Sequence, residues 1–138
     1  ALACYKSNLI AAFGSVSGVV LDTSGTCEPS HATPLINIHG TNDGVLPYNG
    51  SSDYSSVADA LNYWRGINNT TTSTSDIYND NGTTIEQYLY TGGDNGSSVV
   101  HYKVIGGGHV WFDMNYNGAS TGRLVWDFVS QYNLADLQ

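Results

Sequence analysis

The fold is decided by residues 35–44, Leu35-Ile-Asn-Ile-His39-Gly-Thr-Asn-Asp43-Gly44. The first five residues form a short β-branched stretch, which predicts a strand in the middle of a covered sheet. The turn-forming residues that follow predict a polar loop at the carboxyl end of this strand. Open α/β sheets place their functional loops at that end of their strands. Asp43 is therefore a candidate for a site residue.

Two elements are predicted upstream of this strand. Residues 1–6 have neither a cap nor a preceding turn, so they indicate the end of a helix that begins further upstream. Residues 9–20 are a continuous run of small and apolar residues without alternation, which predicts another strand buried on both faces. A loop around residues 24–34 joins this strand to the next.

The downstream part alternates between helical and extended patterns. Residues 51–66 predict an amphipathic helix, residues 68–81 an exposed polar loop, residues 84–90 and 99–105 a β-hairpin, and the segment after residue 120 a last helix. The predicted N-caps are Ser55 or Ser56 for the first helix and Ser120 or Thr121 for the second. The apolar positions that define the two helices are Val57, Ala58, Leu61 and Trp64 in the first, and Leu124, Val125, Phe128 and Val129 in the second.

This order of elements predicts an α/β fold, with residues 1–138 forming a single incomplete domain around a mostly parallel sheet.

The net charge is -8, with four Lys or Arg against twelve Asp or Glu, which argues against nucleic acid as a partner. The sequence has no apolar run of the roughly 20 residues that a membrane-spanning helix needs. A low proportion of charged residues, together with abundant Asn, Ser, Thr, Gly and Tyr, favours a secreted protein.

The two cysteines, Cys4 and Cys27, are candidates for a disulfide. On the chain-entropy estimate, a bridge that closes a loop of this length would stabilise the fold by about 3 kcal/mol. Two buried free thiols are the alternative, and the sequence does not choose between them.

A candidate base follows the second strand of the predicted hairpin. His109 comes directly after Gly106-Gly107-Gly108, and three glycines permit the sharp backbone turn that would carry an imidazole over the edge of the sheet. Trp111 stands two residues later and is a candidate wall of an acyl pocket. Ester hydrolysis at neutral pH needs a nucleophile, a base and an acid that orients the base, and Asp43 and His109 fit the last two roles.

The order of acid before base, each after a strand, is the arrangement of the α/β-hydrolases. Four blocks make the resemblance more specific: residues 10–18 (Ile-Ala-Ala-Phe-Gly-Ser-Val-Ser-Gly), 39–48, 106–111 and the closing segments around 113–115 and 124–128. In these blocks the sequence resembles the secreted polyhydroxybutyrate depolymerase and feruloyl esterase branch of that fold. The loop after His109 departs from the branch, because Val110 and Phe112-Asp113 replace its usual Thr and Pro-Gly.

The resemblance implies a carboxylic ester hydrolase in which Asp43 orients His109 and His109 activates a serine at a Gly-x-Ser-x-Gly elbow. The nearest match, Gly14-Ser-Val-Ser-Gly18, has Val16 in the nucleophile position and lies in a predicted strand. The chain is thus expected to be the C-terminal part of the hydrolase fold, inactive alone, with an N-terminal segment or a homodimer partner covering the sheet. The substrate is expected to be a polyester or a plant cell-wall ester, and no cofactor is implied.

The other polar candidates are given structural roles. His39 is expected to be a packed residue bonded to nearby backbone, and His31 and His101 to be surface or strand-face residues. Asp113, Asn115 and Asn117 match the first half of a calcium loop, but Leu124 stands where the bidentate glutamate should be. We therefore predict a polar loop with Asn117 or Ser120 capping the last helix, and no metal site.

A different class of function is also compatible with the composition. The Tyr and Trp content and the acidic, Asn-rich sequence are typical of carbohydrate-facing proteins, so a non-catalytic extracellular binding module is the alternative. The two hypotheses differ in one distance. The hydrolase requires His109 within hydrogen-bond reach of Asp43, whereas the binding module does not.

Overall fold

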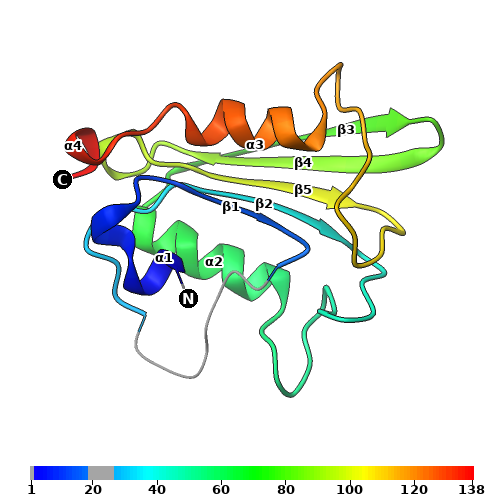
Figure 1. Ribbon diagram of the computed structural model, residues 1–138, viewed down its shortest axis with the longest axis horizontal. Coiled ribbons are helices and arrows are strands. Elements are labelled where there is room, and N and C mark those ends of the chain that lie inside the picture. The colour runs from blue at the N-terminus through cyan, green and yellow to red at the C-terminus, as the bar shows by residue number, and fades with distance from the viewer. Residues whose placement is uncertain (1, 19–26) are drawn as a thin grey trace.

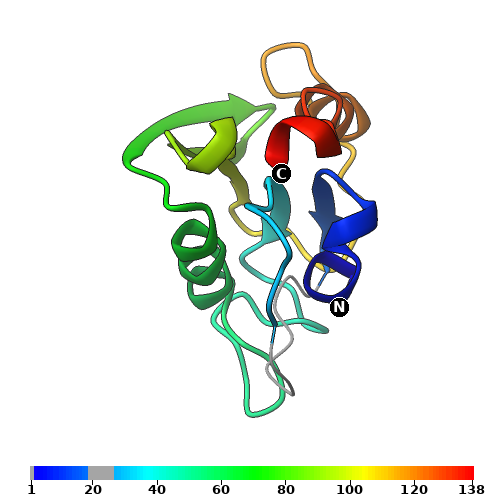
Figure 2. The ribbon, with the colours of Figure 1, turned by 90° about the vertical axis from the view of Figure 1, so that its left-hand side faces the viewer.

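The computed structural model describes residues 2–18 and 27–138, and its described residues form one sheet with helices on both faces (Figures 1 and 2). The strand order is β1-β2-β5-β4-β3. The strands are β1 (Phe13–Val16), β2 (Leu35–Gly40), β3 (Thr72–Asp80), β4 (Thr83–Thr91) and β5 (Val99–Val104). The helices are α1 (Leu2–Tyr5), α2 (Val57–Asn68), α3 (Thr121–Val129) and α4 (Leu134–Leu137), with 3-10 turns at Ser7–Leu9 and Asp94–Gly96.

The sheet is mixed, which corrects the expectation of a mostly parallel sheet. β1 pairs with β2, and β2 with β5, in parallel, whereas β5 with β4 and β4 with β3 are antiparallel. The antiparallel part contains the two longest strands, β3 and β4. The α/β class is nevertheless correct, because the parallel strands β2 and β5 are joined by a crossover that contains α2, which packs on one face of the sheet.

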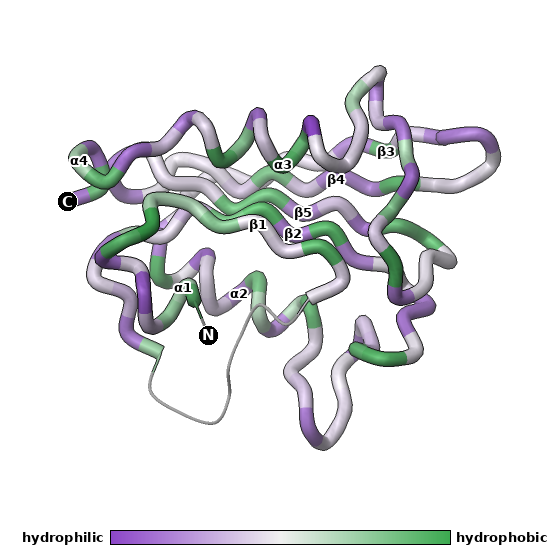
Figure 3. The backbone as a smooth tube through the Cα atoms, viewed as in Figure 1, coloured by the Kyte–Doolittle hydropathy of each residue, from purple (hydrophilic) through white to green (hydrophobic). Residues whose placement is uncertain are grey.

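Two clusters of apolar side chains fill the space between the sheet and its helices. On the α3 face, Ile36, Ile38 and Phe128 belong to a cluster that also takes in residues of the loop before α3. On the opposite face, Leu35 and Val99 pack with Trp64 of α2 and Cys4 of α1. In Figure 3 the hydrophobic colour is concentrated along β1, β2 and β5, whereas the tip of the β3–β4 hairpin is mainly hydrophilic. The two faces of the central strands are therefore both covered.

Several predicted elements are confirmed by the structure. The strand over residues 35–39, the antiparallel pairing of residues 84–90 with 99–105 and both amphipathic helices are present. Ser56 caps α2 by accepting a hydrogen bond from Asp59 N, and Ser120 caps α3 by accepting one from Arg123 N. Within α2, however, Ala58 is exposed and Ala60 is buried in its place.

The predicted loop over residues 68–81 is wrong, because residues 72–80 form β3. This strand pairs with β4 along its whole length through the two-residue turn Asn81-Gly82, whose φ angles are 48° and 92°. Positive φ at both positions is the signature of a type I′ hairpin turn, which Asn-Gly favours. β3 is exposed on most of its residues, so its sequence lacks the apolar alternation by which a strand is recognised.

The predicted strand over residues 9–20 is shorter in the structure, and residues 19 and 20 lie outside the described part of the chain. Residues 7–9 form a 3-10 turn and only Phe13–Val16 are extended. β1 is also the last strand of the sheet on its side, and three of its four residues are half-buried rather than buried. One side of its backbone is therefore unpaired within the described residues.

A disulfide joins Cys4 to Cys27, with the two Cα atoms 4.8 Å apart. The two cysteines are therefore bonded to each other and are not free thiols. The bridge links α1 covalently to the segment before β2. Cys4 is buried in the same cluster as Trp64.

In the described part of the chain, no helix has the length and apolar character required to cross a membrane.

Candidate active site

Two loops that follow neighbouring strands meet at the carboxyl end of the sheet. Thr41 N donates to Val104 O at 3.0 Å, and Asn42 N donates to Gly107 O at 2.9 Å, so the loop after β2 is bonded to the end of β5. Gly40 makes this approach possible, because a Cβ at that position would overlap the carbonyl oxygen of Gly107. The loops that carry Asp43 and His109 are thus held together by backbone contacts.

Asp43 is 5% exposed and uses both of its carboxylate oxygens. Its Oδ1 atom accepts hydrogen bonds from Val45 N at 2.9 Å and Leu46 N at 2.8 Å, and its Oδ2 atom lies 3.0 Å from His109 Nδ1. Burial raises the pKa of Asp43, but the backbone hydrogen bonds and the His109 ring outweigh burial and leave the pKa below its usual value. Asp43 is therefore an ionised carboxylate at neutral pH.

The other partner of this contact is open to solvent. The His109 side chain is 40% exposed, and its Nδ1 atom faces the Asp43 carboxylate. A carboxylate can only accept, so Nδ1 carries the hydrogen and the neutral ring has its lone pair at Nε2. Within the described residues Nε2 has no hydrogen-bond partner. The pair therefore presents a base to the solvent-facing side of the loop.

Ser17, at the end of β1, anchors the segment that follows His109. Its Oγ atom donates a hydrogen bond to Val110 O at 2.7 Å, across 93 residues of sequence. Ser17 also has φ of 51°, and the other described non-glycine residues with positive φ are all asparagines, which tolerate this conformation better. The sequence shows only a serine near a glycine, and neither its strain nor its partner was predicted.

Exposed apolar side chains lie close in sequence to the Asp43–His109 pair. Trp111, the predicted substrate contact, is 65% exposed, and Val45 and Val110 are exposed as well. Each of them lies within two residues of Asp43 or His109 in the chain. These three residues, the apolar rim, expose nonpolar surface on the two segments that carry the pair, which suits an ester with a nonpolar part.

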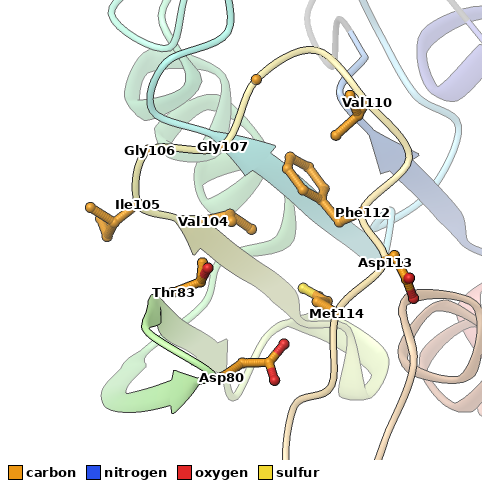
Figure 4. A pocket seen from close by; sticks show the side chains of 11 residues that line it. Asp80, Thr83, Val104, Ile105, Gly106, Gly107, Val110, Phe112, Asp113 and Met114 are labelled. Atoms are coloured by element: carbon orange, nitrogen blue, oxygen red, sulfur yellow. The ribbon is translucent and has the colours of Figure 1, made fainter.

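A cavity of about 230 Å³ is lined by residues of the loop after β5 and by the ends of β3 and β4 (Figure 4). Its lining includes the polar residues Asp80, Thr83 and Asp113 and the apolar residues Phe112 and Met114. Gly108 and Val110 line it, but His109 and Trp111 do not. The imidazole is therefore not part of the cavity lining, and we assign the cavity no part in the chemistry.

The calcium-like segment forms a turn that is built from its own polar groups. Asn115 Oδ1 accepts a hydrogen bond from Gly118 N at 2.6 Å, and Asn115 N donates to Asp80 at 2.9 Å. Asn117 and Gly118 both have positive φ and close a tight two-residue turn. Across residues 2–18 and 27–138, no three His, Cys, Asp or Glu side chains are grouped as metal ligands.

The remaining histidines differ partly from expectation. His31, expected at the surface or on a strand, is a buried loop residue whose ring nitrogens contact the backbone carbonyls of Ala32 and Ser7. His101 is on a strand face, as expected, and is buried on β5, with Nδ1 facing Asn37 O and Nε2 accepting from Tyr48 OH at 2.8 Å. Burial lowers the pKa of His101 to about 4.

The lowered pKa of His101 predicts a loss of stability on mild acidification. Between pH 6.5 and 4 the unfolded chain binds a proton at this residue and the folded chain does not, so the free energy of unfolding should fall by roughly 3 kcal/mol across this window. Urea unfolding followed by tryptophan fluorescence at several pH values measures it. His101→Gln should flatten the pH dependence, and an unchanged dependence in that variant would contradict the assignment. Asp43 acts separately, because its contribution is lost only at lower pH, below 3.8.

Comparisons with known proteins do not place the chain in a family, since neither a scan against protein-family models nor a search of curated proteins found a match. The functional argument therefore rests on the geometry of the site.

Proposed function

We propose that this chain supplies the acid and the base of a secreted serine carboxylic ester hydrolase with a partial α/β-hydrolase fold. The observation that carries the proposal is the 3.0 Å contact between Asp43 Oδ2 and His109 Nδ1. The acid follows β2 and the base follows β5, two neighbouring parallel strands, in the chain order typical of that fold. The disulfide is compatible with an extracellular location.

The proposed mechanism uses His109 as the proton carrier. His109 Nε2 takes the proton of a serine hydroxyl as the serine oxygen attacks the ester carbonyl. The imidazolium that forms is stabilised by the Asp43 carboxylate, and it then gives its proton to the leaving alcohol oxygen as the acyl-enzyme forms. A water molecule, deprotonated by the same nitrogen, hydrolyses the acyl-enzyme and restores the serine.

The nucleophile is proposed to come from another segment of polypeptide. No hydroxyl among the described residues is bonded to His109 Nε2, and Ser17 Oγ is already bonded to Val110 O. The unpaired side of β1 is a suitable place for a strand that would bring the serine and the oxyanion donors to the site. We propose that this strand and the serine belong to an N-terminal segment of the same protein.

The substrate is proposed to be a polyester of short hydroxyalkanoates or a hydroxycinnamate ester of plant cell walls. The apolar rim of Val45, Val110 and Trp111 supports this class, because both substrates carry nonpolar parts next to the ester. A binding module is less well supported. The exposed aromatic residues Tyr5, Tyr54, Trp111 and Trp126 come from four separate segments, and a binding module does not require the Asp43–His109 contact.

The test is hydrolysis of p-nitrophenyl butyrate by the natural protein that carries this chain. His109→Ala should lower kcat by at least about 10⁴-fold, because no other group would accept the serine proton. His31→Gln is the control, since it also replaces a loop histidine but leaves the Asp43–His109 pair intact. Residues 1–138 alone should show no turnover. Hydrolysis that survives His109→Ala in a folded protein would refute the proposal.

A further inference from the structure

The ring of His39 lies against the loop that holds Asp43, and the direction of its hydrogen bonds can be deduced. His39 is 2% exposed, and its Nε2 atom is 2.8 Å from Leu46 O and 3.2 Å from Asp43 Oδ2. A carbonyl and a carboxylate both accept hydrogen bonds, so Nε2 must carry a hydrogen. His39 Nδ1 is buried without a hydrogen-bond partner among the described residues. The polar interactions of this ring are thus all made with residues 43–46.

The turn formed by residues 43–46 is fixed by hydrogen bonds to both backbone polar groups of Leu46. Leu46 N donates to Asp43 Oδ1, and Leu46 O accepts from His39 Nε2, so both backbone polar groups of Leu46 are fixed. With Oδ1 occupied by two backbone N–H groups, the rotation of the Asp43 carboxylate is restricted and Oδ2 is directed to His109. The Nε2–H group of His39 lies near Oδ2 as well, which adds favourable charge on that side.

We infer that His39 is a positioning residue, which acts through the Leu46 carbonyl and Asp43 to hold the carboxylate in the geometry that His109 needs. The inference rests on the proposed function, because it assigns His39 to the Asp43–His109 pair. The sequence predicts His39 to be a packed residue bonded to nearby backbone, and the structure confirms both parts. The Tyr48 ring lies edge-on with its centroid 6.0 Å away, and Nε2 is bonded to Leu46 O. Packing alone needs only the volume of the side chain, whereas positioning Asp43 needs the hydrogen-bond donor at Nε2.

The first measurement uses the unaltered protein. Long-range ¹H–¹⁵N NMR spectra of the histidine rings report which nitrogen carries the hydrogen at neutral pH. We expect His39 in the Nε2–H form and His109 in the Nδ1–H form. A neutral His39 with its hydrogen on Nδ1 overturns the inference, because that ring would have no donor for Leu46. This result is decisive even if a variant fails to fold.

The second measurement compares three variants by the low-field proton signal of His109 Nδ1–H. His39→Leu should lose the signal or broaden it, because the turn is released and the hydrogen bond to Asp43 opens to exchange with water. His39→Gln should keep it, since its amide N–H can replace Nε2–H, and His31→Gln should keep it as a control. A signal of unchanged intensity in a folded His39→Leu protein overturns the inference.

Neither measurement requires turnover, so the failure of the proposed esterase activity would be seen separately. If the activity is present, His39→Leu should lower kcat by up to about 100-fold with little change in KM, and His39→Gln should restore most of it. A rise in KM without a fall in kcat would contradict a role in positioning.

Discussion

Replacing Asp43 with asparagine should lower kcat for ester hydrolysis by about four orders of magnitude, the size of effect seen when a triad aspartate is changed in a serine protease. The structure explains why so similar a side chain should fail. Val45 N and Leu46 N both donate to Oδ1, so the amide oxygen of asparagine must take that place. The amide NH₂ group then faces His109 Nδ1, which becomes an acceptor, and the ring hydrogen moves to Nε2. A ring with its hydrogen on Nε2 cannot accept the serine proton.

The measurement is steady-state hydrolysis of p-nitrophenyl butyrate, with KM and kcat determined separately. Asp53→Asn is the control, because Asp53 is exposed and its carboxylate makes no contact with the site. The NMR tautomer of His109 provides a second readout, and Nε2–H is the form expected in the variant. A fall of less than about tenfold would show that Asp43 does not orient His109.

Removing the disulfide should lower the free energy of unfolding by about 3 kcal/mol. The bridge joins residues that are 23 positions apart, and opening it restores the conformational freedom of that loop to the unfolded chain. A loss of this size is a large part of the 5 to 15 kcal/mol that typically separates folded from unfolded states. Urea unfolding of the double variant Cys4→Ser, Cys27→Ser measures this loss in the free energy of unfolding.

The reducing agent dithiothreitol supplies the internal control. It should destabilise the unaltered protein to a similar extent and leave the double variant unchanged. Equal stability of the oxidised protein and the double variant would mean that α1 and the segment before β2 are held by their packing alone. Cys4 is buried beside Trp64, so part of the loss will come from placing a hydroxyl in this cluster, and dithiothreitol separates that part from the crosslink.

The sequence predicted the elements that bury an apolar face. The short β-branched run over residues 35–39 predicts β2, all of whose residues are buried, and apolar residues at helical spacing predict α2 and α3. The approach of Asp43 to His109 is a requirement of the hydrolase hypothesis, and the structure contains it. Their roles in catalysis remain proposals.

The features that escaped prediction have no apolar pattern or depend on residues far apart in the chain. β3 is exposed along most of its length, and the Asn81-Gly82 turn was the only local signal of a hairpin. The contact of Ser17 with Val110 spans 93 residues, and nothing in the local sequence indicates it. His39 was judged by its position in a strand, and its effect on Asp43 follows only from the closure of the turn at Leu46.

The backbone of Ser17 has a consequence for directed evolution of this chain. A library selected for thermal stability alone should enrich glycine or asparagine at position 17, because either residue relaxes the positive φ angle. Glycine has no hydroxyl with which to hold Val110 O, so such a selection would release the segment beside His109 while it raised the melting temperature. Stability and activity should therefore be scored together at this position.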